Sequence, residues 1–259
     1  MPDNYETFKK EYLLLSGIDL NSYKENQMKR RIDNFILKHH ESGYRSFLNL
    51  IKQDSKVYEQ FITYLTINVS EFYRNPAQWQ TLEKDILPAL IKKFNAPLKI
   101  WSAACSTGDE PYSLAMVLGE FLPFNKFQIL ATDLDLEVLN KAKKGVFSEK
   151  SLKGLPEKYR RRYIMDAGNG TVRVSDELKT CIRFEQLNLL KDPYPTGIHM
   201  IVCRNVMIYF TEEAKSDIYY KFADSLCRQG ILFVGSTEQI IGAPNYGFNG
   251  VQSFFYEKQ

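Results

Sequence analysis

From Leu98 onward the sequence alternates short apolar runs with segments of helical periodicity, and this alternation restricts the fold more than any other feature. The apolar runs are 98–104, 127–132, 199–203 and 231–235, and the helical patterns are 111–121, 134–144 and 212–227. Such runs are typical of buried parallel strands, which need crossover connections that are usually helices. The pattern predicts a doubly wound α/β sheet, in which ligands bind beyond the carboxyl ends of the strands.

The preceding part of the chain has a different pattern. Apolar residues such as Phe8 and Tyr12 recur at intervals of three or four, and strand patterns are almost absent. A longer helix follows Pro76, whose fixed φ suits a first helical turn. We expect a helical domain at 1–75, a linker helix at 76–97 and an α/β domain at 98–259.

A basic stretch interrupts the alternation between Val146 and Val174. It holds seven basic residues and three acids, a net charge of +4, so the rest of the +3 chain sums to −1. The turn Gly168-Asn169-Gly170 precedes an alternating segment at 171–174, which predicts a hairpin. We expect a small antiparallel β subdomain inserted at about 146–185.

Composition excludes several classes of protein. With 44% hydrophobic and 25% charged residues the chain is of the globular type, and no apolar run approaches the ~20 residues of a membrane span. The start, 1–10, lacks the apolar core of a secretory signal, so we expect a cytoplasmic protein with no membrane insertion. Four dispersed cysteines and three histidines predict no metal site. The mild net charge disfavours nucleic acid as a partner.

Small residues follow the first predicted strand. The strand at 98–104 runs into Cys105-Ser106-Thr107-Gly108, where a ligand can approach the backbone and the next helix offers free N–H groups. A single glycine does not make the G-x-G-x-x-G signature of a dinucleotide site. A tight turn without a ligand is an equal alternative.

Asp133 ends the second predicted strand, where a carboxylate can accept hydrogen bonds from both ribose hydroxyls of a nucleoside. The alternative is a helix N-cap, a role also open to Asp135. Together, the turn and the acid favour an adenosine-containing cofactor. The missing phosphate-binding glycine loop disfavours NAD and ATP, and S-adenosylmethionine, which has no phosphates, fits.

Three further polar residues lie near the expected ligand edge. Glu110 is placed to bind the cationic end of the cofactor, or else to favour the helix dipole. Arg204 and Asn205 follow the strand at 199–203. The structural alternatives for them are an ion pair and a turn, respectively.

Three long motifs, at 66–74, 101–113 and 203–210, closely resemble motifs of the CheR family of chemotaxis receptor methyltransferases, in the same order and spacing. Departures are small: Ser70, Tyr73 and Asp109 stand where Thr, Phe and Glu are common. The resemblance covers nearly the whole chain. It implies a helical N-terminal domain and a Rossmann-like S-adenosylmethionine-binding α/β domain that carries an inserted β subdomain.

The resemblance also implies an activity, which is methyl transfer from S-adenosylmethionine to glutamate side chains of chemotaxis receptors for sensory adaptation. The products are glutamyl methyl esters and S-adenosylhomocysteine, and the partner is the cytoplasmic helical domain of the receptor. The implied cofactor-binding residues are Asn68, Ser70, Arg74, Glu110, Asp133, Asn188, Leu189, Arg204 and Asn205. A rival hypothesis is a non-catalytic module that uses S-adenosylmethionine as a signal. We expect a monomer.

The acceptor carboxylate, with a reference pKa of about 4.3, is already ionised at neutral pH and needs no general base. Methyl transfer then mainly requires alignment of the reacting atoms. We assign Tyr209 the role of orienting the acceptor through a hydrogen bond, with a core aromatic as the alternative. Two basic surfaces, on the helix at 24–38 and on the insertion, would meet an acidic receptor, and each is otherwise a solvated charged face. The short turn at 167–170 favours recognition without a tethering peptide.

Overall fold

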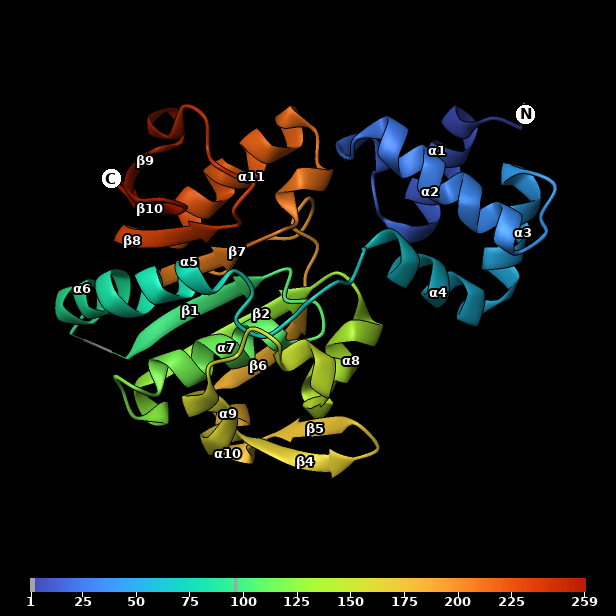
Figure 1. Cartoon of the computed structure of the whole chain (residues 1–259). Helices are drawn as coiled ribbons and strands as arrows, with labels where there is room; N and C mark the ends of the chain where they lie inside the picture. The colour runs from blue at the N-terminus through green and yellow to red at the C-terminus, as the bar shows by residue number, and fades with distance from the viewer. Residues whose placement is uncertain (1–2, 96) are drawn as a thin grey trace. The chain divides into compact units, whose positions relative to one another are not determined.

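The structure, a computed structural model, describes residues 3–95 and 97–259 (Figure 1). Ala96, near the end of the predicted linker helix at 76–97, lies outside the described residues. The chain forms two compact units: one comprises the residues up to Ile67 together with Tyr209–Asp217, and the other comprises Asn68–Ile208 and Ile218–Gln259. Within the described ranges, no helix has the length and apolar character needed to cross a membrane.

The first unit is helical, as the apolar spacing predicts. Its elements are α1 (Tyr5–Ser16), the short 3-10 turn η1 (Leu20–Ser22), α2 (Glu25–Lys38), α3 (Tyr44–Gln53) and α4 (Ser55–Leu65). Fully buried aromatic rings form the core, and Phe47 packs edge-on against Phe61 with ring centroids 4.8 Å apart. The Asn4 side chain accepts the Thr7 N–H and caps α1. Burial of the aromatic stripe stabilises helices that are marginal in isolation.

The second unit contains a seven-stranded sheet, which confirms the predicted α/β class. Its strands are β1 (Leu98–Ala103), β2 (Phe127–Asp133), β6 (Ile182–Gln186), β7 (Ile198–Cys203), β8 (Leu226–Val234), β9 (Phe248–Gln252) and β10 (Phe255–Lys258). The spatial order is β6-β2-β1-β7-β8-β10-β9. The first five strands are parallel, and β10 and β9 extend the sheet with antiparallel pairing. The carboxyl ends of β1, β2 and β7 therefore meet at one edge.

Helices cover both faces of this sheet (Figure 1). They are α5 (Pro76–Thr81), the π-helical turn η2 (Leu82–Ile86), α6 (Leu87–Lys93), α7 (Asp109–Leu118), α8 (Leu136–Lys144) and α11 (Glu212–Ser225), with short 3-10 turns η3 (Phe124–Lys126), η5 (Met207–Tyr209) and η6 (Ala243–Tyr246). Ile100 of β1 shares a core cluster with Trp79 and with residues of α7. The next residue, Trp101, points to the opposite face and packs against Phe222 of α11 with ring centroids 5.5 Å apart.

The insertion is a separate three-stranded antiparallel sheet, as predicted. Its strands β3 (Val146–Ser148), β4 (Ile164–Gly168) and β5 (Thr171–Val174) lie in the order β3-β5-β4, accompanied by η4 (Glu149–Leu152), α9 (Glu157–Tyr163) and α10 (Asp176–Lys179). Asn169 and Gly170 connect β4 to β5 with φ of 54° and 70°. Two consecutive left-handed residues match the twist of a tight hairpin, and Asn-Gly adopts them readily.

Candidate functional site

The turn after β1 brings two helices close together. Ala104 and Ser106 have φ of 60° and 49°, and Gly108 has φ of 95° immediately before α7 begins. A Cβ on Gly108 would lie 2.8 Å from the Cβ of Ala142 in α8. The single glycine of this turn is therefore required by the left-handed φ and by helix packing, so its presence by itself indicates no ligand.

Asp133 lies against this turn. Its Oδ2 accepts the backbone N–H of Ser106 at 2.8 Å, and its Oδ1 accepts the N–H of Asp135 at 3.0 Å. Asp135 caps α8 by accepting the Glu137 N–H at 2.8 Å. The helix-cap alternative for Asp133 is therefore wrong, because Asp135 has that role. Asp133 holds the end of β2 to the turn after β1.

Asn68 joins the same cluster. Its amide Nδ2 donates to Asp135 Oδ2 at 2.9 Å, and its Oδ1 accepts the Ser106 hydroxyl at 3.4 Å. The structure thus brings Asn68 and Asp133, two predicted cofactor-binding residues, into contact with the same residue, Ser106. Burial raises the pKa of Asp133 to about 6, although N–H donation from Asp135 and Ser106 opposes this shift.

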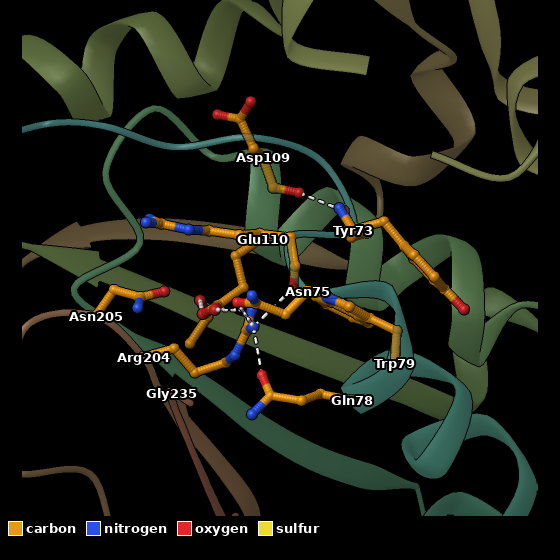
Figure 2. Close-up of polar contacts among 12 residues, drawn as sticks. Tyr73, Asn75, Gln78, Trp79, Asp109, Glu110, Arg204, Asn205 and Gly235 are labelled. Atoms are coloured by element: carbon orange, nitrogen blue, oxygen red, sulfur yellow. Dashed lines mark hydrogen bonds and ion pairs between the residues drawn. The ribbon is translucent and has the colours of Figure 1, made fainter. Parts of the chain in front are cut away.

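Glu110 forms the second part of the site, in the first turn of α7. Its Oε1 accepts the Ser102 hydroxyl at 2.8 Å, and its Oε2 lies 3.5 Å from a guanidinium nitrogen of Arg204 (Figure 2). Burial raises the pKa of the Glu110 carboxyl, and the positive charge of Arg204 opposes that shift. Glu110 therefore does more than favour the helix dipole, because it is buried beside a paired cation.

Arg204 is the centre of a hydrogen-bonded network (Figure 2). Its side chain is 2% exposed, and its Nη2 donates to the Arg74 carbonyl at 2.7 Å, to Asn75 Oδ1 at 3.2 Å and to Gln78 Oε1 at 2.7 Å. The guanidinium also lies 4.9 Å from the ring centroid of Phe233. The ion-pair alternative for Arg204 is thus present in the structure. The network ties the segment after β7 to the segment before α5.

Two of the departures from the family pattern contact each other. The Ser70 hydroxyl hydrogen-bonds the carboxylate of Asp109, and the Thr107 hydroxyl donates to Asp109 Oδ2 at 2.6 Å. Asp109 is 1% exposed, and burial raises the pKa of its carboxyl. Hydrogen bonding from Ser70 and Thr107 opposes this shift, so Ser70 lies beside the first turn of α7.

The remaining predicted residues lie in two other segments. Asn188 and Leu189 are buried in the loop after β6, where Asn188 Oδ1 accepts the N–H of Leu190 at 2.9 Å. The N–H of Leu187 donates to the Asp133 carbonyl at 3.0 Å, which places this loop beside the end of β2. Arg74 donates a side-chain hydrogen bond to the Val69 carbonyl at 3.1 Å.

Tyr209, the predicted catalytic residue, belongs to the first compact unit. Its carbonyl accepts the Lys24 N–H at 2.9 Å, and its neighbour Phe210 pairs with Tyr23. The Tyr209 side chain is half-buried. Its role as the residue that orients the acceptor stays a prediction.

Sequence reasoning missed four residues of these networks: Asn75, Gln78, Ser102 and Glu238. Ser102 gave no signal, since a serine in a buried strand is common. Gln78 meets Arg204 across 126 positions of sequence, which no local pattern shows. Glu238 follows the carboxyl end of β8 by four residues, so the reasoning that selected Asp133 and Arg204 would also have found it.

Comparisons with known proteins agree with this architecture. Residues 68–253 match the family described as CheR methyltransferase, SAM binding domain, and residues 3–66 match CheR methyltransferase, all-alpha domain. A chemotaxis protein methyltransferase of Listeria innocua is 43% identical over 242 residues, covering 93% of this chain and 92% of that protein. One from Escherichia coli is 34% identical over 232 residues, covering 86% and 79%. A solved TehB-like SAM-dependent methyltransferase from Corynebacterium glutamicum is 17% identical with a TM-score of 0.39, covering 71% of this chain and 93% of that one.

The α/β sheet and the matched SAM-binding domain define an S-adenosylmethionine-dependent methyltransferase, so the prediction of an enzyme is confirmed. Within that class, the chain belongs to the CheR methyltransferase family.

Proposed function

We propose that this enzyme transfers the methyl group of S-adenosylmethionine to glutamate side chains in the cytoplasmic helical domain of chemotaxis receptors. The products are γ-glutamyl methyl esters and S-adenosylhomocysteine. Family membership and the printed names of the relatives support a chemotaxis methyltransferase. The observation that carries the proposal is the placement of two carboxylates after neighbouring strands β2 and β1: Asp133, which is buried, and Glu110, whose side chain is 13% exposed.

The donor groups of the site fit S-adenosylmethionine. Each oxygen of Asp133 accepts one backbone N–H, which leaves further lone pairs for ribose hydroxyls. Glu110 would hold the ammonium group of the methionine part, and Arg204 would lower the cost of keeping that carboxylate ionised. We propose that Asn68, Ser70, Arg74, Asn188, Leu189 and Asn205 complete the binding site.

The bound cofactor would supply a methyl group activated by the positive sulfur. The protein contributes alignment: an acceptor carboxylate oxygen bonds to the methyl carbon as the carbon–sulfur bond breaks, and no proton needs to be removed from the acceptor. Tyr209 would orient the acceptor by donating a hydrogen bond that leaves it nucleophilic. Its exchange for phenylalanine is the direct test of this role.

The two basic surfaces differ in how many of their cations are already paired within the protein. In the insertion, Lys158 pairs with Glu83 at 3.2 Å and Arg162 pairs with Glu120 at 3.2 Å, so acids outside the insertion offset its charge. On α2, Arg31 donates to the Tyr64 carbonyl and lies over the Tyr64 ring. The exposed cations of this surface are Lys24, which precedes α2, and Arg30 and Lys38 of α2. We propose that these three meet an acidic receptor surface, and the short β4–β5 turn favours recognition without a tether.

The test is incubation of the protein with tritiated S-adenosylmethionine and receptor-containing membranes. The proposal predicts label on the receptor, and a higher Michaelis constant for receptor at high salt because exposed charges are screened. Replacing Lys24 and Lys38 with glutamine should remove most of that salt response. Cofactor binding without label on any receptor would instead favour the non-catalytic sensing module.

A further inference from the structure

Glu238 links two loops at the carboxyl edge of the sheet. It is 5% exposed and lies in the turn after β8, where its own N–H donates to the Gly235 carbonyl at 3.0 Å. Its Oε2 accepts the N–H of Asn205 at 2.6 Å and the N–H of Gly235 at 2.9 Å. Its Oε1 accepts the N–H of Met207 at 2.7 Å. One carboxylate therefore binds three backbone N–H groups from the loops after β7 and β8.

The chemistry of this contact requires a carboxylate. An ionised carboxyl group only accepts hydrogen bonds and offers two oxygens, whereas an amide offers one oxygen and an NH2 group that donates. In either orientation of a glutamine at this position, the NH2 would face at least one backbone N–H. That N–H would be buried without an acceptor, which is costly in a protein interior.

Gly235 shows that the backbone is shaped around this carboxylate. A Cβ at Gly235 would lie 2.3 Å from Glu238 Oε2 and 3.0 Å from the Asn205 nitrogen. Position 235 therefore requires glycine, because the Glu238 carboxylate and the Asn205 backbone approach it closely (Figure 2 shows Gly235 beside Asn205). Any side chain at position 235 would displace the Glu238 carboxylate or the Asn205 backbone.

The loop held by Glu238 contains two proposed cofactor-binding residues. Asn205 has φ of 61°, a left-handed conformation that asparagine tolerates better than most non-glycine residues. On the preceding residue, the Arg204 side chain is fixed by the Arg74 carbonyl and by Gln78. Arg204 is therefore held through its side chain, and Asn205 and Met207 are held through their backbone.

We propose that Glu238 is a positioning residue, which holds the segment 204–207 in the conformation that binds the cofactor. This inference rests on the proposed cofactor site and deepens it. Glu238 acts through the backbone of Asn205 and Met207 and is distinct from the proposed cofactor-contacting residues.

The test compares Glu238→Gln with Ser225→Ala in the full chain. Ser225 is buried at the opposite end of α11 from its first turn, and its hydroxyl donates to the Pro195 carbonyl, so its loss destabilises the same domain away from the site. The measurements are the Tm, the Kd for S-adenosylhomocysteine by calorimetry, and amide hydrogen exchange at Asn205 and Met207. We expect the Kd of the Glu238→Gln variant to rise about tenfold, the scale set by one buried N–H left without an acceptor, with faster exchange at both amides. Ser225→Ala should lower the Tm and leave the Kd unchanged.

A Glu238→Gln protein that binds S-adenosylhomocysteine like the wild type would overturn the proposal, as would an equal loss of affinity in Ser225→Ala. If Glu238→Gln does not fold, Gly235→Ala takes its place with the same expectations, because the added Cβ displaces the carboxylate. The readouts also separate this inference from the proposed function. A wild-type protein that binds S-adenosylhomocysteine and methylates no receptor refutes the receptor reaction, while the comparison of the variants still decides the role of Glu238.

Discussion

The carboxylate of Asp133 binds the backbone N–H of Ser106 at 2.8 Å, so the acid that ends β2 is joined to the turn that follows β1. The two residues are 27 positions apart in sequence, and their contact belongs to the proposed cofactor site. Burial of this carboxylate raises its pKa, and the N–H groups of Asp135 and Ser106 oppose that shift.

Cofactor affinity should fall on acidification. The pKa of Asp133 is about 6 in the folded protein and 3.8 ordinarily, so about half of the folded protein carries a protonated Asp133 near pH 6. A protonated carboxyl accepts hydrogen bonds from ribose hydroxyls less well than a carboxylate. The Kd for S-adenosylhomocysteine should therefore rise about tenfold between about pH 7 and about pH 5. Calorimetry over this range measures it.

The matched control is Asp133→Asn, which should bind more weakly and have a flatter pH profile. The sign for stability is the opposite: because the folded pKa is raised, ionisation of Asp133 lowers the free energy of unfolding of the ligand-free protein as pH rises from about 4 to about 6. A variant whose affinity keeps the full pH dependence of the wild type would show that another group titrates.

Gly108 should be far less tolerant of substitution than Gly168. Both have positive φ, 95° and 79°, but a Cβ on Gly108 meets Ala142, whereas nothing lies within 4 Å of a Cβ on Gly168. Gly168→Ala should cost about 1–2 kcal/mol of unfolding free energy from the left-handed backbone alone. Gly108→Ala should cost about 1–3 kcal/mol more from overpacking. Urea denaturation measures both, and equal losses would contradict the packing role.

Replacement of Arg204 by lysine should destabilise the protein even though the positive charge remains. A lysine cannot reproduce the guanidinium contacts with the Arg74 carbonyl, Asn75 and Gln78, so buried acceptors would lose their donor. We expect a loss of about 2–3 kcal/mol. Arg161→Lys is the control, since Arg161 is 80% exposed, and it should change stability by less than about 0.5 kcal/mol. Similar values for the two variants would mean that the Arg204 network contributes little.

Tyr209→Phe removes one hydroxyl and should lower kcat for receptor methylation while leaving the Kd for S-adenosylhomocysteine unchanged. The physical reason is that the hydroxyl would orient the acceptor and not the cofactor. We expect a fall of about tenfold or more, in line with the loss of one well-placed hydrogen bond in a transition state. Unchanged turnover would remove Tyr209 from the mechanism.

Local rules carried most of what the sequence predicted correctly. The Asn169-Gly170 turn demands two left-handed residues, and these residue types supply them, so the hairpin was visible in the sequence. The strands at the centre of the sheet were visible as apolar runs. The outer strands β6, β10 and β9 were not predicted as strands. In β9 the apolar pattern is missing, because this strand is largely exposed and contains Gly250.

The sequence predicted individual residues of the site, but it did not predict the hydrogen bonds and ion pairs that join them. The sequence left the helix cap open to Asp133 and also to Asp135, and the hydrogen bond from the Glu137 N–H to Asp135 decides between them. The hydrogen-bond and ion-pair partners of Arg204 come from segments more than ninety residues away, so these contacts depend on tertiary packing. The net charge of the basic insertion can be counted from the sequence. The sequence does not show that Glu83 and Glu120, from other segments, form ion pairs with it and offset that charge.

The most direct test of the central claim is the chemical stability of the transferred methyl group. Receptor-containing membranes labelled by this protein with tritiated S-adenosylmethionine are treated with base, and volatile methanol is collected. The account predicts that the receptor-bound label is released as methanol, because carboxyl methyl esters hydrolyse in base, and that Asp133→Asn reduces the label. Label that resists base would place the methyl group on nitrogen or sulfur and would contradict glutamate methylation.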